Sequence, residues 1–172
     1  MSKKQKNNPV KNTPKKKPAV AQAIKIICQN RKASFNYQLT DKYEAGMVLT
    51  GSEVKSLRMG KANLTDAYGD IRGNEVFLVQ ANIEPYDKGG YANHEPKRRR
   101  KLLMHRKEIN TLIGKIQAKG LTLVPTKMYF KAGKAKVEMA LGTGKKTYDK
   151  RHDIKTREVK KEMDRHVKRG RG

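Results

Sequence analysis

Side chains that commonly carry catalysis are few in this sequence and far apart. The four histidines stand alone: His94, His105, His152 and His166. No Cys/His cluster has zinc spacing, and neither a Gly-x-Ser-x-Gly nor a His-Glu-x-x-His motif occurs. The central acids are scattered, with no pair placed for two-metal chemistry: Asp66, Asp70, Glu75 and Glu84. The sequence therefore predicts a protein that is not an enzyme and that uses no metal or other cofactor.

One segment resembles part of a phosphate-binding loop. It is the run GTGKKT at 142–147. Met139 stands where the first glycine of the loop is required, and Lys146 replaces the hydroxyl residue that would bind magnesium. We interpret the run as the end of a strand followed by a basic turn. The common RNA modules also lack their signatures, since no aromatic RNP1 segment and no GxxG clamp is present.

The chemistry that the sequence does favour is the binding of a polyanion. Lys and Arg number 41 against 16 Asp and Glu, so the formal net charge is +25. Self-repulsion of this size destabilises a compact chain unless an anion neutralises it. Nucleic acid is the leading partner, and an anionic membrane surface is the rival. No apolar run approaches the ~18 residues of a spanning helix, so we expect a soluble, cytoplasmic protein.

Cations gather in three places of the central region. The segment 96–107 holds seven Lys and Arg, and Arg suits phosphate through bidentate pairing. The run NRKA at 30–33 and the segment 51–68 are further candidates. Glu44 lies among these basic residues, and its carboxylate can accept a hydrogen bond from the amino group of a nucleobase or from a ribose hydroxyl. Two alternatives stay open. The segment 96–107 can be a solvated loop that binds nothing, and Glu44 can simply form a surface ion pair. The candidates in these segments are Asn30, Arg31, Lys32, Glu44, Lys55, Arg58, Lys61, Asn63, Arg99, Arg100 and Lys101.

The elements that must position these residues are mainly strands. Strands are expected over 24–30, 34–39 and 45–51, then as a hairpin turning at Gly73-Asn74, and again as a pair turning at Ala132-Gly133-Lys134. A short helix with Ser52 as N-cap is expected over 52–60, and a longer one over 105–120. About six short antiparallel strands with up to three helices predict a small OB-like barrel, with an open α+β sandwich as the alternative.

Composition divides the chain into three parts. Residues 1–22 carry seven lysines and no acid, which predicts a disordered basic arm. Residues 23–144 hold nearly all the branched and aromatic residues, and ~120 residues can bury a core of their own. Residues 145–172 form a basic tail whose apolar stripe is thin, so we expect it to be disordered when free and helical on a partner. The tail candidates are Lys145, Lys146, Tyr148, Asp149, Lys150, Arg151 and Lys155.

Five segments, in this order, resemble a known family. They are GSEVKSLRMGKANLTDAY, NHEPKRRRKLLMHRKEI, GLTLVP, KVEMALGTGKKTYDKR and the following DIK. They resemble SmpB, the SsrA-binding proteins (small protein B) of bacteria, over about residues 24–160. The resemblance implies an OB-like barrel that binds the tRNA-like domain of transfer-messenger RNA. It implies entry into stalled ribosomes with elongation factor Tu and GTP, followed by tagging of the nascent chain.

The resemblance also implies roles for matched residues. Glu44, Leu103 and His105 correspond to positions implicated in RNA binding, although some members have Asn at the His105 position. Asn30, Arg31 and Lys32 correspond to an RNA-facing loop. Tyr148 falls where some members have His, and the tail from Asp149 onward is implied to probe the decoding centre and the empty message channel.

Four classes of function were compared. The leading one is a monomeric transfer-messenger RNA partner for ribosome rescue. The second is a basic structural protein of the ribosome. The third is an RNA-modifying enzyme or nuclease, and the fourth is a membrane-surface protein, for which neither end has an apolar face with aromatic anchors.

Overall fold

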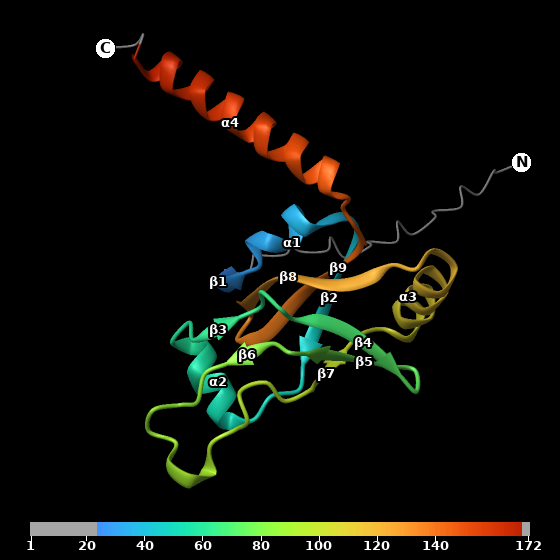
Figure 1. Ribbon diagram of the computed structural model, residues 1–172. Coiled ribbons are helices and arrows are strands. Elements are labelled where there is room, and N and C mark those ends of the chain that lie inside the picture. Colours follow the sequence, from blue (N-terminus) through green and yellow to red (C-terminus); the bar gives the residue numbers. More distant parts are fainter. Residues whose placement is uncertain (1–23, 170–172) are drawn as a thin grey trace, which may run out of the picture.

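The fold is a closed ring of strands with helices around it, seen in a computed structural model that describes residues 24–169 (Figure 1). The strands are β1 (Ile24–Gln29), β2 (Tyr37–Met47), β3 (Ala62–Asn63), β4 (Tyr68–Arg72), β5 (Glu75–Val79), β6 (Asn82–Ile83), β7 (Arg100–Leu103), β8 (Thr122–Lys131) and β9 (Lys134–Gly144). The helices are α1 (Arg31–Asn36), α2 (Gly51–Arg58), the 3-10 turn η1 (Gly90–Ala92), α3 (Arg106–Lys119) and α4 (Thr147–Arg169).

Six strands form the ring in the order β8-β4-β5-β7-β2-β9, and β9 closes it by pairing with β8. All the pairings are antiparallel. Strand β1 adds to the outer edge of β8, and β3 pairs with β6 in a separate two-stranded ribbon. The expected mainly-β class with antiparallel strands in a small closed arrangement is confirmed, and the open sandwich is excluded by the β8–β9 and β2–β9 ladders.

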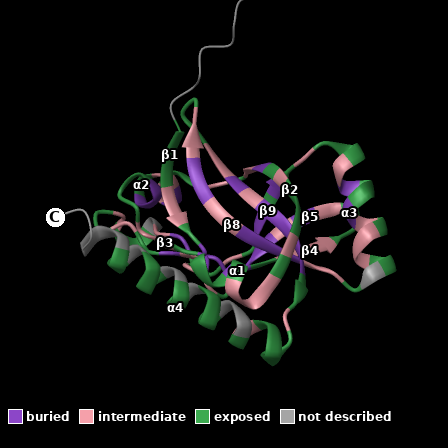
Figure 2. Cartoon of the chain, turned by 90° about the horizontal axis from the view of Figure 1, so that it is seen from above, coloured by how far each residue is buried: buried purple, intermediate pink, exposed green. Residues whose placement is uncertain are grey.

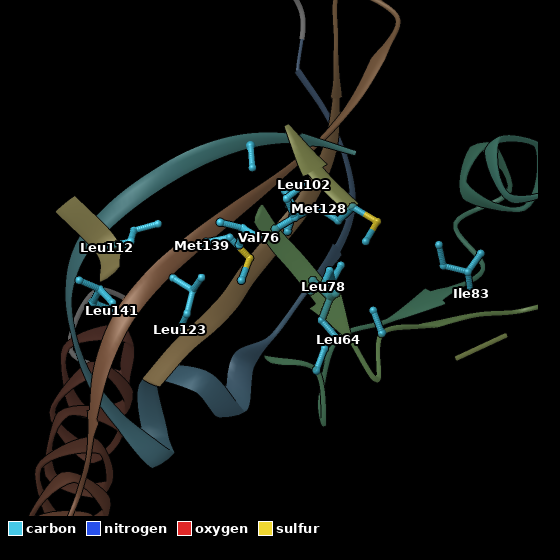
Figure 3. Close-up of a cluster of buried hydrophobic side chains, with 14 of the residues drawn as sticks. Leu64, Val76, Leu78, Ile83, Leu102, Leu112, Leu123, Met128, Met139 and Leu141 are labelled. Atoms are coloured by element: carbon cyan, nitrogen blue, oxygen red, sulfur yellow. The ribbon is translucent and has the colours of Figure 1, made fainter. Parts of the chain in front are cut away.

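The core fills the ring because successive strand side chains face opposite ways. Val137, Met139 and Leu141 of β9 point inward and are fully buried, whereas Lys136 and Glu138, on either side of Val137, are partly exposed. Figure 3 shows Met139 and Leu141 in one cluster with Leu123 of β8 and Val76 of β5. Figure 2 shows the same alternation as bands of buried and half-buried residues along β8 and β9. One side of each ring strand is therefore free to carry polar chemistry.

The expected turns and the long helix are confirmed. Gly73 and Asn74 have φ of 54° and 65°, as a two-residue hairpin turn of type I′ requires. Ala132 and Gly133 also have positive φ and join β8 to β9. Helix α3 ends at Gly120, whose φ of 58° is the left-handed conformation that glycine adopts most easily.

Three expectations about local structure were wrong. Residues 34–36 belong to α1 rather than to a strand, because the Asn30 side chain accepts from the Ala33 N–H at 3.1 Å and starts a helical turn. The strands expected over 34–39 and 45–51 are one strand, β2, which shifts register between Leu39 and Lys42. Helix α2 begins after Thr50 instead of Ser52, since the Glu53 carboxylate accepts from the Thr50 N–H at 2.7 Å.

The end of the chain is a long helix that leaves the ring. Helix α4 projects from the side of the molecule where α1 lies (Figure 1). The Lys145 N–H donates to the Asn36 carbonyl at 2.9 Å, and the Lys150 ammonium lies 5.8 Å from the Phe35 ring centre. The prediction that this tail orders only on a partner stays a prediction, and the arm over 1–22 lies outside the described residues.

Candidate nucleic-acid interface

Lysines surround two carboxylates on the outer side of β2, β8 and β9. We call this surface the Glu44 face. It consists of Lys42, Glu44, Lys127, Tyr129, Lys131, Lys136 and Glu138. The strand register brings Glu44 opposite Glu138 and Tyr129 opposite Lys136. Because these residues alternate with the buried ones on the same strands, the ring itself fixes their position.

Glu44 is held by three donors. Its carboxylate accepts from the Lys136 ammonium at 2.5 Å, the Lys131 ammonium at 3.1 Å and the Tyr129 hydroxyl. The hydrogen bonds from Lys136 and Tyr129 lower its pKa to about 2, and burial together with Glu44 raises the pKa of Tyr129. Glu44 therefore stays ionised at every physiological pH. Its side chain is still 35% exposed, so it orients two ammonium groups and remains open to a ligand.

Glu138 repeats this arrangement one step along the ladder. It accepts from the Thr126 hydroxyl at 2.7 Å and pairs with Lys127 at 2.9 Å and Lys42 at 3.5 Å. Burial acts to raise the pKa of Glu138, but the bonds from Thr126 and Lys127 outweigh it and lower the pKa. Such ion pairs in contact with solvent contribute little to stability, so their main effect is to hold four lysines in fixed directions.

Two grooves flank the Glu44 face. One, of about 480 Å³, is lined by Leu103, Gly46, Phe130, Lys134 and Lys136. Leu103 of β7 is 55% exposed and pairs with Gly46 of the neighbouring strand β2. Gly46 in turn pairs with Lys136 of β9 on its other side. The other groove, of about 490 Å³, includes Arg31, Lys42, Lys127 and Glu138. The structure thus places the candidates Arg31, Glu44 and Leu103 on one continuous surface.

Asn30 and His105 lie at the starts of helices. Asn30 is buried, and its side chain donates to the Leu64 carbonyl at 2.9 Å and accepts from Ala33, so its amide is already used in positioning α1. His105 is exposed immediately before α3, two residues beyond Leu103, and its N–H donates to the Glu108 carboxylate at 3.1 Å. Of the two, His105 is the one available to a ligand.

The candidates of α2 and the turn after it form a separate group. Lys55 and Arg58 are exposed in the last turn of α2, and the Lys55 ammonium lies 5.2 Å from the Tyr86 ring centre. The Lys61 ammonium donates to the Asp87 carboxylate at 2.7 Å. Asn63 is exposed and accepts from the Thr65 N–H at 2.8 Å. These residues lie near the loop over 84–96 and do not belong to the Glu44 face.

The cluster at 97–107 is divided by the fold, and the prediction that Arg100 contacts phosphate is wrong. Arg100 is fully buried and donates to the buried Glu53 carboxylate at 2.7 Å. Arg98 donates to the other oxygen of Glu53 at 2.5 Å. Lys101 pairs with Glu75 on the outer side of β7. Arg99 remains exposed, beside Arg72 and Phe77.

The tail candidates lie at the start of α4. Tyr148 is 78% exposed and shares one side of the helix with Arg151, Ile154 and Lys155. The Asp149 carboxylate accepts from the Lys146 N–H at 3.2 Å, so it caps the first turn from the third helical position. Lys145 donates through its ammonium to the Ser34 carbonyl at 2.8 Å. The structure therefore gives Asp149 a capping role at the start of α4.

Sequence reasoning missed most of the Glu44 face. Lys127, Tyr129, Lys131, Lys136 and Glu138 were not selected as candidates. Their alternation with Met128, Val137 and Met139 was a usable signal, because it places every one of them opposite the core. What the sequence could not give is the pairing of β9 with both β2 and β8, which gathers them.

Two further findings concern other kinds of site. Within residues 24–169, no group of three or more His, Cys, Asp or Glu is arranged to hold a metal ion. Over the same range, no helix is long and apolar enough to cross a membrane.

Comparisons with known proteins agree with one another. A family model described as SmpB protein matches residues 27–169. An SsrA-binding protein of Syntrophobacter fumaroxidans is 54% identical over 157 residues, covering 91% of this chain and 98% of the relative. One of Thermobifida fusca is 52% identical, with the same coverage of both chains.

Among solved structures, a chain described under "tmRNA-SmpB: a journey to the center of the bacterial ribosome" is similar with a TM-score of 0.60. It is 48% identical, and the match covers 70% of this chain and 85% of that one. The extent of these matches leaves one conclusion: the chain belongs to the SmpB family.

Proposed function

We propose that this protein binds transfer-messenger RNA through the Glu44 face and the adjoining Leu103, and carries it to stalled ribosomes. The observation that carries the proposal is the ladder of lysines fixed around two carboxylates, because phosphate contacts need cations in defined directions. The exposed Leu103 beside it offers apolar contact to an unstacked base. The relatives named SsrA-binding proteins, and the solved structure described as tmRNA-SmpB, support this assignment.

The proposal gives the three parts of the chain different tasks. The ring over 23–144 binds the RNA as a monomer, and elongation factor Tu with GTP joins through the charged RNA. The tail over 145–172, with Lys145, Lys146, Tyr148, Lys150, Arg151 and Lys155, enters the decoding centre and the empty message channel. The arm over 1–22 adds basic charge.

Recovery and sequencing of RNA that copurifies with the protein tests the whole proposal. We expect one dominant species with a tRNA-like end. A broad mixture of ribosomal or messenger fragments contradicts it, and retention on isolated subunits through a high-salt wash favours a structural protein of the ribosome.

Glu44→Gln is expected to weaken binding to transfer-messenger RNA about tenfold, since bonds to a charged group contribute about 1.5–3 kcal/mol. The substitution makes the protein more positive, so non-specific attraction alone predicts tighter binding. Gel-shift titrations at several salt concentrations measure the affinity for RNA and its dependence on salt. We expect the slope of affinity against salt concentration to stay unchanged, because no phosphate contact is lost. Glu75→Gln, which removes an acid paired with Lys101, is the control. Equal behaviour of the two variants contradicts the role of Glu44.

Tyr148→Ala is expected to bind free transfer-messenger RNA normally and to lower tagging on stalled ribosomes about tenfold, because stacking on a base contributes about 1–3 kcal/mol. The residue is exposed and lies outside the ring, so folding is unaffected. Tyr148→His keeps a planar ring and should largely retain tagging. Tagging yield in a reconstituted translation system checks this, and a loss of RNA affinity in Tyr148→Ala would count against it.

A further inference from the structure

A second concave site lies beside α1, outside the Glu44 face. It is a cavity of about 420 Å³ between α1, the loop that joins β3 to β4, and the start of β8. That volume falls in the range of about 300–1,000 Å³ usual for small-molecule pockets. Asn30 lines both this cavity and the Arg31 groove, and the other lining residues differ. The residues that matter here are Lys32, Asn36, Tyr37, Asp66, Tyr68 and Thr122.

Three of the polar side chains that line this cavity have no partner among the described residues. Within residues 24–169, the Lys32 ammonium, the Asn36 amide and the Asp66 carboxylate make no side-chain hydrogen bond or ion pair. On the Glu44 face, by contrast, both carboxylates pair with lysines. An acid in a protein of net charge +25 finds a cation easily, so an unpaired Asp66 across a cavity from an unpaired base indicates groups that await a ligand.

Two tyrosines make the cavity suitable for a flat ring. Tyr37 and Tyr68 both line it, Tyr68 is 42% exposed, and neither ring stacks on a cation of the described chain. Aromatic side chains stack on unpaired nucleobases whatever the sequence. The strong positive charge favours a ligand that carries phosphate, and Lys32 lies at the site to contact it.

The polar groups distinguish between bases. A carboxylate only accepts hydrogen bonds, and guanine presents two adjacent donors, N1–H and N2–H, that match its two oxygens. Beside them guanine carries the O6 acceptor, which suits the Lys32 ammonium or the Asn36 amide. Uracil has one N–H between two carbonyl acceptors, which would repel the second oxygen of Asp66. Adenine lacks an N1–H.

We propose that this cavity binds an unpaired guanine of an RNA strand, with Asp66 reading its Watson–Crick edge and Tyr68 stacking on its face. The proposal rests on the proposed function only in taking RNA as the ligand. The cavity shares α1 with the root of the tail, since Lys145 donates to the Asn36 carbonyl and Lys150 covers Phe35. A guanine held here would therefore lie next to the point where α4 leaves the ring.

Short single-stranded RNAs test the base preference directly. The pentamers UUGUU, UUAUU and UUUUU are titrated into the ¹⁵N-labelled full chain and followed by NMR. We expect UUGUU to bind about tenfold tighter than the others, as one bidentate base contact gives. Its shifts should concentrate at 32–37 and 65–68. Equal affinities, or shifts confined to the Glu44 face, overturn the proposal.

A matched pair of variants separates recognition from charge. Asp66→Asn and Glu84→Gln each remove one exposed acid whose carboxylate makes no hydrogen bond or ion pair within the described residues, and only the first lines the cavity. Electrostatics alone predicts that both bind RNA more tightly. We expect Asp66→Asn to lose the preference for UUGUU and Glu84→Gln to keep it. Identical behaviour of the two variants contradicts the reading of guanine by Asp66.

The source of the guanine is found by kethoxal, which modifies N1 and N2 of unpaired guanines. Transfer-messenger RNA and small ribosomal subunits are each probed with the wild-type chain and with Asp66→Asn. A guanine protected only by the wild type identifies the source, and protection in neither RNA overturns the proposal. If the wild type prefers UUGUU but does not bind transfer-messenger RNA, the proposed function fails and the cavity stands. If the wild type binds transfer-messenger RNA but shows no preference among the pentamers, the proposed function stands and the guanine site fails.

Discussion

A chain truncated after Gly144 is expected to bind transfer-messenger RNA nearly as well as the full chain and to support no tagging above background. Every ring strand is complete at Gly144, and the buried apolar core described here ends at Leu141. None of the α4 residues whose burial is described is buried in that core. The contacts with α1 named here are made by Lys145, just before the helix, and by Lys150. Tagging of a chain stalled on a message without a stop codon is the measurement.

The complementary variant is Glu44→Gln in the full chain, which should lose RNA affinity and keep an intact tail. The two defects are then separable, because saturating RNA rescues Glu44→Gln and leaves the truncated chain inactive. Tagging by the truncated chain at a normal level would refute the division of labour between ring and tail.

Glu53→Gln is expected to destabilise the fold by about 3–5 kcal/mol, because breaking a buried ion pair leaves an uncompensated charge. Glu53 and Arg100 are both 0% exposed, and Arg98 completes the cluster. Arg100 also donates to the carbonyls of Ala81 at 2.6 Å and Pro96 at 2.9 Å, so the cluster joins α2, β7 and the loop before it. Denaturant unfolding measures the loss as a lower midpoint. Glu75→Gln, at an exposed pair, should cost under about 1 kcal/mol.

Glu53 also makes the stability of the fold depend on pH in the acid range. Burial acts to raise the pKa of Glu53, but the bonds from Arg98 and the Thr50 N–H, with the charge of Arg100, outweigh it and lower the pKa to about 2. A depressed pKa contributes stability above the ordinary value of 4.5 that is lost as pH falls toward 2. Unfolding midpoints measured from pH 6 to pH 2.5 should therefore decline for the wild type and change less for Glu53→Gln. Parallel curves for the two proteins would contradict this.

The sequence predicted the elements well where local chemistry decides them. The Gly73-Asn74 turn, the end of α3 at Gly120 and the hairpin at Ala132-Gly133 follow from backbone preferences of a few residues. It failed at 34–36, where the alternation of Phe35 and Tyr37 suggested a strand. There the Asn30 cap, with its bond to the Leu64 carbonyl, favours a helical turn.

The site was less predictable than the fold because charge alone does not say where a side chain points. Arg99 and Arg100 look alike in the run KRRRK, yet one is exposed and the other is buried against Glu53. That distinction depends on a contact between residues 47 positions apart. Leu103 came from the resemblance to the family, whereas Glu44 was also selected from its place among basic residues. The lysines that hold Glu44 became visible only with the pairing of β9 with β2 and β8.

The double pairing of β9 has a consequence for how this protein is made. β9 is the last strand among the described residues. It pairs with both β2 and β8, so the ring cannot close until residues 134–144 have been synthesised. Pairing between β2 and β9 spans about 100 residues, and such non-local contacts form late and slowly. Ring closure therefore waits until β9 has been synthesised. A copy whose own translation stops before that point has Glu44 but not Lys136, and it cannot assemble the surface proposed here to rescue such ribosomes.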